Sequence, residues 1–285
     1  MSPYQGRRVD TSTLTRLHEL SGPIASSTMS SDAAQRGRIF LHRGNLPQAR
    51  ACYEEAVEES RSGGDPRALS DALGNLGNVC AMMGDRDRAE ACYREALAIQ
   101  RAREDRSAIG HTLANLGNLH ADAGHAERAR SYYLEACDLL EVTQDQRALG
   151  ILYSNLALQD QMLGQHDQAI ETFTKALELH RAVGDEKGLA VTYGQLGKTF
   201  LLAGKSQQAE RCLNNSSEHF IKLGNGAGEA GALRLLADLY EQRDDCLSAI
   251  RCLERIQHIG LTLRQPPSDA DAARLSRLRK RTSSS

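Results

Sequence analysis

The sequence predicts an all-α protein made of repeated helix–turn–helix units, and three observations support this. Residues 67–265 contain no proline, although the 285-residue chain has 6 prolines and 24 glycines. That stretch is rich in Ala, Leu, Glu, Gln and Arg, which are good helix formers. The same residue types also recur every 40 positions along it. Because one helix pair buries too little apolar surface to be stable alone, such units are expected to stack into a solenoid.

The 40-residue period is carried by polar, small and turn-forming positions. It is visible as Asp65, Asp105, Asp145, Asp185 and Asn225, as Ala49, Ala89, Ala129, Ala169, Ala209 and Ala249, and as Gly44, Gly84, Gly124, Gly164 and Gly204, with Asp244 in the sixth place. Six units are therefore predicted, at about 31–65, 66–105, 106–145, 146–185, 186–225 and 226–265.

Each unit is predicted to be two antiparallel helices. In the second unit, the first helix is expected over about 67–83 and ends at Gly84, which tolerates the left-handed conformation. Asp85 is expected to cap a second helix that runs to about 103. A small residue recurs in the first helix at 37, 77, 117, 157, 197 and 237, and a bulky one in the second at 53, 93, 133, 173, 213 and 253. This pairing predicts close packing of the two helices.

The pattern of Leu116 and Gly117 in a first helix, followed by Ala129, Tyr133 and Ala136 in a second, resembles the tetratricopeptide repeat family. The resemblance covers about four-fifths of the chain. The 40-residue period is similar to the longer repeats of kinesin light chains and bacterial regulatory arrays. The resemblance implies a right-handed superhelix whose first helices line a concave groove that holds peptides or partner proteins.

The two ends depart from the repeat. Residues 1–30 are rich in Ser and Thr and are expected to form a flexible arm, which is a candidate for self-association. Residues 266–285 are expected to form a capping helix at about 270–281 and a basic, Ser-rich tail. The basic run from Arg274 to Arg281 has two readings, a solvated helix end or a contact for an acidic partner or nucleic acid.

The groove face is predicted at the first-helix offsets i, i+4, i+7 and i+11, which share one helical stripe. We take these residues, together with Arg38 of the first unit, as candidate contacts for a peptide or protein partner. They are Asp71, Asn75 and Asn78; His111, Asn115, Asn118 and Asp122; Ile151, Asn155, Leu158 and Met162; and Gln195, Lys198 and Leu202.

Two features of this stripe stand out. Asn75, Asn115, Asn155 and Gln195 form a ladder of amides, which could bind the backbone of an extended peptide or could link neighbouring first helices. Apolar residues gather in the fourth and fifth units, where they could contact a ligand or be covered by the N-terminal arm. These are Ile151, Leu158, Met162, Val191 and Leu202.

No motif predicts catalysis, a cofactor or a metal site. The seven cysteines include four at one repeat position and no C-x-x-C pair, so packing is the expected role. His120 and Asp160 occupy equivalent positions and could form a buried pair. The net charge of −2 argues against a dedicated nucleic-acid binder, and no stretch has the length of a membrane span. A cytoplasmic location is expected, because no secretion signal is recognisable.

The sequence therefore predicts a non-catalytic scaffold or adaptor that binds an extended peptide or a partner protein in its groove. The alternative is a peptide- or ligand-sensing regulator that switches a partner protein. A clamp for chaperone tails is disfavoured, because Arg38, Lys198 and Arg234 are widely separated along the groove stripe.

Overall fold

The structure is a computed structural model that describes residues 32–264 and 268–283. Within these ranges all regular secondary structure is α-helical, which confirms the predicted class. The described residues divide into two compact units, an N-terminal unit of residues 32–152 and a C-terminal unit that begins at residue 153. The predicted flexible arm and its self-association concern residues 1–30, which lie outside the described ranges.

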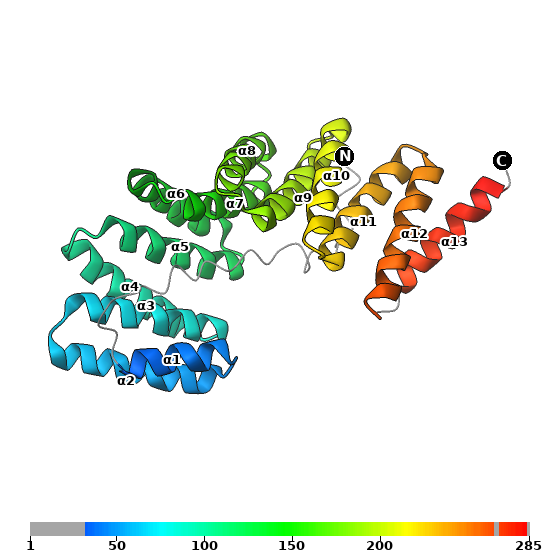
Figure 1. Cartoon of the computed structure of the whole chain (residues 1–285). Coiled ribbons are helices and arrows are strands. Elements are labelled where there is room, and N and C mark those ends of the chain that lie inside the picture. The colour runs from blue at the N-terminus through cyan, green and yellow to red at the C-terminus, as the bar shows by residue number, and fades with distance from the viewer. Residues whose placement is uncertain (1–31, 265–267, 284–285) are drawn as a thin grey trace. The chain divides into compact units, whose positions relative to one another are not determined.

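In the N-terminal unit, consecutive helices pack as antiparallel hairpins (Figure 1). From α1 to α6, each helix contacts the next along the chain, so that α2 lies between α1 and α3, and α4 between α3 and α5. The helices are α1 (Asp32–His42), α2 (Leu46–Gly63), α3 (Pro66–Met82), α4 (Arg86–Ala102), α5 (Arg106–Asp122), α6 (Ala126–Thr143) and the first part of α7 (Gln146–Met162).

In the C-terminal unit, each helix from α8 to α12 likewise contacts the next helix along the chain (Figure 1). Its core joins side chains from every helix from α7 to α13 in two apolar clusters. After the end of α7, the helices are α8 (His166–Ala182), α9 (Glu186–Leu202), α10 (Ser206–Lys222), α11 (Gly226–Gln242), α12 (Cys246–Thr262) and α13 (Asp269–Ser283).

The repeated acidic positions cap the first helices. Asp65 Oδ1 accepts a hydrogen bond from the backbone N–H of Arg67, and Asp105 Oδ1 accepts one from Ala108. Such caps satisfy N–H groups that have no partner inside the helix. Asp85 caps α4 as predicted, and Gly84 before it has a φ of +81°. The predicted helix bounds in this repeat agree with the structure to about a residue.

The small and bulky positions pack against each other as the pattern predicts. A Cβ atom added to Gly77 would lie 2.5 Å from Cε1 of Tyr93, and one added to Gly117 would lie equally close to Tyr133. Both tyrosines are buried, and each ring occupies the space that a side chain at the facing glycine would fill. The missing Cβ therefore sets how closely the two helices of a repeat approach.

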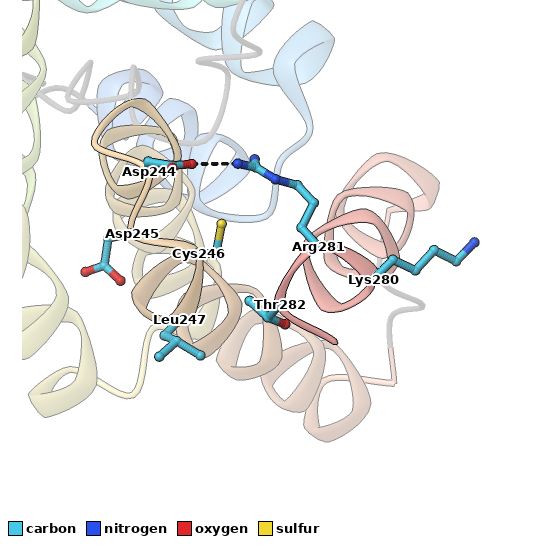
Figure 2. A pocket seen from close by; sticks show the side chains of 7 residues that line it. All are labelled: Asp244, Asp245, Cys246, Leu247, Lys280, Arg281 and Thr282. Carbon is cyan, nitrogen blue, oxygen red and sulfur yellow. Dashed lines mark hydrogen bonds and ion pairs between the residues drawn. The ribbon is translucent and has the colours of Figure 1, made fainter. Parts of the chain in front are cut away.

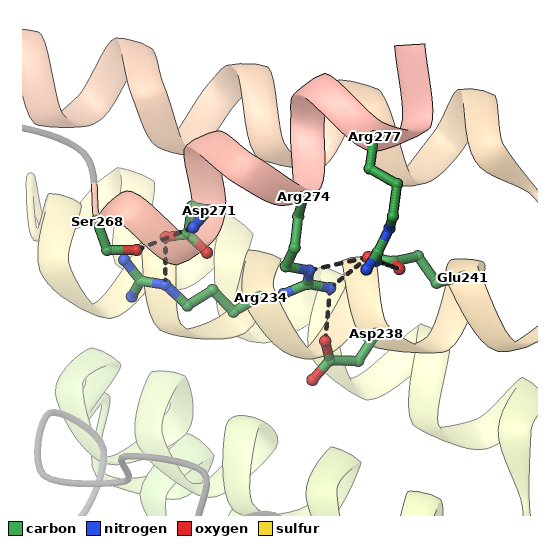
Figure 3. Close-up of polar contacts among 7 residues, drawn as sticks. All are labelled: Arg234, Asp238, Glu241, Ser268, Asp271, Arg274 and Arg277. Atoms are coloured by element: carbon green, nitrogen blue, oxygen red, sulfur yellow. Dashed lines mark hydrogen bonds and ion pairs between the residues drawn. The ribbon is translucent and has the colours of Figure 1, made fainter. Parts of the chain in front are cut away.

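Helix α13 packs through its buried Leu275 and Leu278, which belong to the apolar cluster of the C-terminal unit, and through ion pairs with α11 (Figure 3). Arg274 contacts Asp238 and Glu241, and Arg277 also contacts Glu241. Arg279 and Arg281 pair with the acidic residues Glu254 and Asp244. The basic run is therefore not a freely solvated helix end, because its arginines are paired within the chain.

Glycine-to-alanine substitutions one turn apart in α3 test this packing. We expect Gly77→Ala to lower the free energy of unfolding by about 1–3 kcal/mol, because the new methyl group collides with Tyr93. Gly74→Ala is the matched control, since nothing lies within 4 Å of its added Cβ. It should raise stability by about 0.5–1 kcal/mol through helix propensity. Urea denaturation followed by circular dichroism measures both changes, and equal effects would contradict the packing role.

Candidate functional site

A hollow of about 290 Å³ lies between α3 and α5, with α4 contributing to its wall, and we call it the α3–α5 hollow. It lies within the N-terminal unit and brings together a third of the residues predicted from the stripe. The predicted residues that line it are Asp71, Asn75, Asn78, His111 and Asn115.

Two of these side chains have polar groups available to a ligand. Among the described residues, no partner forms a hydrogen bond or ion pair with the Asp71 carboxylate or the Asn75 carboxamide, and both side chains are half-buried. Burial raises the pKa of Asp71, although Arg67 and Arg103 oppose this shift. Partial burial of a polar group without a partner is unfavourable, so a ligand that supplied hydrogen bonds here would gain free energy.

The opposite wall of the hollow carries a histidine and a buried hydrogen bond. Burial lowers the pKa of His111, against the influence of Asp145, whose carboxylate lies 3.7 Å from His111 Nε2. Behind it, the Thr112 hydroxyl donates to Gln100 Oε1 over 2.8 Å. This bond joins α4 to α5 and holds the wall in place. Sequence reasoning did not include Gln100 or Thr112 among the site residues.

The amide ladder forms hydrogen bonds within the protein. Asn115 Nδ2 donates to Asn78 Oδ1 over 3.1 Å, and the same oxygen accepts the hydroxyl of Tyr93 at 2.7 Å. Asn118 Oδ1 accepts the Tyr133 hydroxyl at 2.7 Å. These contacts support the second interpretation of the ladder, in which the amides join neighbouring helices. Asn75 differs, because its carboxamide takes part in no such bond within the described chain.

The remaining predicted residues do not line this hollow. Asp122 is exposed on α5, and Ile151 is half-buried on α7. In the C-terminal unit, Gln195 is only 2% exposed and Asn155 only 4%, so the structure corrects the expectation that both amides face an open wall. Leu158 packs against an apolar cluster. Met162 is 60% exposed, while Leu202 and Lys198 are half-buried, and burial lowers the pKa of Lys198.

A second hollow, of about 850 Å³, lies in the C-terminal unit between the α11–α12 turn and the end of α13 (Figure 2). Arg281 reaches across it to Asp244, and Asp245 caps α12 by accepting from the N–H of Ser248. Cys246, Leu247, Lys280 and Thr282 complete its lining. The carboxylates of Asp244 and Asp245 already have hydrogen-bond partners inside the protein. This hollow therefore offers a ligand fewer unpaired acceptors than the α3–α5 hollow does.

A buried serine, a buried histidine and a half-buried aspartate lie close together in the C-terminal unit. Ser154 Oγ lies 3.3 Å from His180 Nε2, and His180 Nδ1 lies 3.0 Å from Asp185 Oδ2. This order of groups is that of a hydrolase triad. However, Ser154 and His180 have no exposed surface, and Ser154 Oγ also lies 3.0 Å from the hydroxyl of Thr192. The group therefore links α7, α8 and α9 and offers no access to a substrate.

The cysteines behave as packing residues in the structure. All seven are free thiols, and all but the half-buried Cys246 are buried. Burial raises the pKa of Cys92, Cys212 and Cys252 to about 11, which keeps these thiols protonated at neutral pH. Within the described residues, no group of three His, Cys, Asp or Glu side chains could hold a metal ion. Among the described helices, none combines the length and apolar character needed to cross a membrane.

His120 has contacts of its own within the N-terminal unit. Its Nε2 lies 3.9 Å from Glu90 Oε1, and its ring stacks on Tyr132 with the centroids 5.3 Å apart. Burial lowers its pKa, and Glu90 opposes that shift. The predicted pairing with Asp160 joins residues of different units and stays a prediction.

Comparisons with known proteins agree with this architecture. A family model described as tetratricopeptide repeat matches residues 28–102, 69–141 and 148–222. Among solved structures, BtubC (BKLC) from P. vanneervenii superposes with a TM-score of 0.69 at 21% identity, covering 77% of this chain and 92% of BtubC. Aspartyl phosphate phosphatase F from Bacillus subtilis gives 0.63 at 14% identity, covering 87% and 69%. No curated protein matches the sequence.

A signal-transduction ATPase from Pyrococcus horikoshii, which has a tetratricopeptide repeat sensor, gives a TM-score of 0.78 at 15% identity. The match covers 86% of this chain and 38% of that one. Likenesses at such low identity show the fold only. The stacked hairpins define a helical-repeat protein of the kind that serves as an interaction scaffold. Since the family model matches more than half of the sequence, the chain belongs to the tetratricopeptide repeat family.

The hydrogen bond between Tyr93 and Asn78 gives a first test of the site. Asn78→Ala should lower the free energy of unfolding by about 1–3 kcal/mol, because it leaves the buried Tyr93 hydroxyl without an acceptor. Adding Tyr93→Phe removes that hydroxyl, so the double variant should be more stable than Asn78→Ala alone. Chemical denaturation of the four proteins in the cycle measures the coupling. Simple additivity of the two changes would contradict it.

The raised pKa of Asp71 gives a second test. The folded chain holds this proton more tightly than the unfolded chain, so ionised Asp71 lowers stability once the pH exceeds both pKa values. Asp71→Asn should therefore melt at a higher temperature than the wild type at pH 7. The difference should shrink on acidification, when Asp71 is neutral in both states. Glu59→Gln, at an exposed position, is the control. A lower melting temperature for Asp71→Asn at pH 7 would instead show that its charge is stabilised.

Proposed function

We propose that this protein is a non-catalytic scaffold that binds an extended peptide segment of a partner protein, and that the α3–α5 hollow is part of the binding surface. The observation that carries this proposal is that Asp71 and Asn75 have polar groups without a partner in the described chain. Both line the hollow, and neither is engaged in a hydrogen bond or ion pair within the described chain. Their neighbours Asn78 and Asn115, by contrast, bond to each other.

The chemistry of the hollow suits a peptide backbone. The Asn75 carboxamide can donate to a peptide carbonyl and accept from a peptide N–H, while the Asp71 carboxylate can accept from an N–H group. A volume of about 290 Å³ accommodates a short stretch of chain and not a large cofactor. Membership of the tetratricopeptide repeat family supports a protein partner in general terms.

A catalytic role finds less support. The Ser154, His180 and Asp185 group resembles a catalytic arrangement in its distances, but its serine and histidine are buried. The α3–α5 hollow contains the hydroxyl of Ser70, which donates to the carbonyl of Arg67 over 2.9 Å and so serves the local helix backbone. The groups that line the hollow are therefore better suited to binding than to nucleophilic attack.

Selection of peptides from a random library against the full-length chain tests the proposal. Asn75→Ala should weaken the selected peptides by roughly 2- to 12-fold, the loss of one hydrogen bond, with the dissociation constant measured by calorimetry. It should not lower stability, because Asn75 has no bond to lose within the described residues and Ala is the better helix former. Glu59→Ala on α2 is an exposed control that should leave binding unchanged. Equal affinities for wild type and Asn75→Ala would refute the assignment of the hollow.

A further inference from the structure

The last turn of α13 carries two hydroxyl groups that bond to the backbone of their own helix. Thr282 Oγ1 donates to the carbonyl of Arg279 over 3.0 Å, and Ser283 Oγ donates to the same carbonyl over 2.7 Å. Within the described residues, neither hydroxyl joins α13 to another helix. Both groups can therefore be modified without breaking a contact of the packed core.

Two arginines precede Thr282, at the positions three residues and one residue before it. Arg279 pairs with Glu254, and Arg281 pairs with Asp244, each over 2.6 Å. The four side chains of these pairs are between 46% and 79% exposed. Exposed ion pairs contribute little to stability, because water screens them. Either arginine can therefore exchange its carboxylate for another anion at small cost.

Thr282 also lines the hollow between the α11–α12 turn and the end of α13 (Figure 2). The charged part of that lining is balanced, with the carboxylates of Asp244 and Asp245 against the cations of Lys280 and Arg281. A phosphate on Thr282 would add a charge of about −2 at pH 7. The lining would then become strongly negative.

The carboxylates of this lining are fixed by the turn that carries them. Asp244 has a φ of +60°, and Asp245 caps α12 by accepting from the N–H of Ser248. A phosphate on Thr282 would face both carboxylates and would attract Arg281 away from Asp244. Negative charge at the C-terminal end of a helix is also unfavourable, because the helix dipole is negative there. All these effects oppose the packing of α13 against the turn.

Helix α13 covers apolar surface of the C-terminal unit. Leu275 is 2% exposed and Leu278 is fully buried, and both belong to the cluster that includes residues of α11 and α12. Leu278 lies one helical turn before Thr282, so loosening of the last turn reaches the edge of this cluster. Movement of α13 would uncover apolar side chains that a partner could bind.

We propose that Thr282 is a phosphorylation site for a protein kinase that recognises arginine before its acceptor, and that the phosphate loosens α13 from the α11–α12 turn. Thr282 Oγ1 attacks the γ-phosphorus of ATP, ADP leaves, and the hydroxyl proton passes to the catalytic base of the kinase. Because helix ends fray, the last turn can present Thr282 to the kinase in an extended form. Ser283 is less suited, since it has Lys280 three positions before it and lies outside the lining of the hollow. The site belongs to the C-terminal unit and is independent of the α3–α5 hollow.

The first test concerns the acceptor. The full-length chain is treated with ATP and the catalytic subunit of cyclic-AMP-dependent protein kinase, and fragmentation mass spectrometry locates the phosphate. We expect it on Thr282, with Arg279→Gln lowering the rate at least about 10-fold through the lost charge. Arg277→Gln is the matched control, because this arginine is also exposed and paired with a glutamate, and it should retain the rate. A phosphate that is absent from Thr282, or equal rates for wild type and Arg279→Gln, would overturn the site.

The second test concerns the loosening of α13. Hydrogen exchange followed by mass spectrometry should show amides of residues 276–283 exchanging at least about 10-fold faster in the phosphorylated chain, while those of α9 stay unchanged. Thr282→Ala treated with the same kinase should show no such change. Asp244→Asn removes one repelling charge and keeps a residue that tolerates the left-handed turn, so it should reduce the effect of the phosphate. Equal exchange with and without the phosphate, or an undiminished effect in Asp244→Asn, would refute the loosening.

Discussion

The close approach of two helices at a position without a side chain is the constraint on which the rest of this structure depends. Where Gly77 faces Tyr93, the tyrosine ring replaces the side chain that the first helix lacks. The hydroxyl of that ring is then carried to the edge of the first helix, where it must find an acceptor. Packing in the core therefore dictates which residue type is needed next to the small position of the first helix. A substitution at the packed tyrosine therefore also changes the hydrogen bonding of the asparagine on the first helix.

This coupling explains why the groove stripe has a mixed character. Asn78 and Asn118 accept bonds from the tyrosines that lie beneath them, so these amides belong to the framework of the repeat. Asn75 and Asp71 occupy the same stripe, yet no tyrosine hydroxyl bonds to them. Equivalent spacing along a helix can thus give a structural role to one amide and leave its neighbour available to a ligand.

Much of the fold could be predicted from the sequence, because residues that recur every 40 positions mark the helix ends, the helix caps and the packing positions. The bounds of α3 and α4 and the cap at Asp85 follow from local rules. The state of each site residue could not be predicted in this way, because it depends on contacts between distant residues. The burial of Gln195, the bond from Tyr93 to Asn78 and the link from His180 to Ser154 all arise from packing across helices. An unpaired donor such as the Tyr53 hydroxyl is invisible until its surroundings are known.

The charge pairing of α13 changes how its arginines can interact with polyanions. Nucleic-acid binding gains much of its free energy from counterions that are released when free cationic side chains meet phosphates. Arg274 and Arg277 are already neutralised by Asp238 and Glu241, so a polyanion would have to compete with carboxylates held a few ångströms away. The same competition applies where Asp244, in the left-handed turn before α12, pairs with Arg281. The basic segment of α13 therefore presents less positive charge to its surroundings than its sequence indicates.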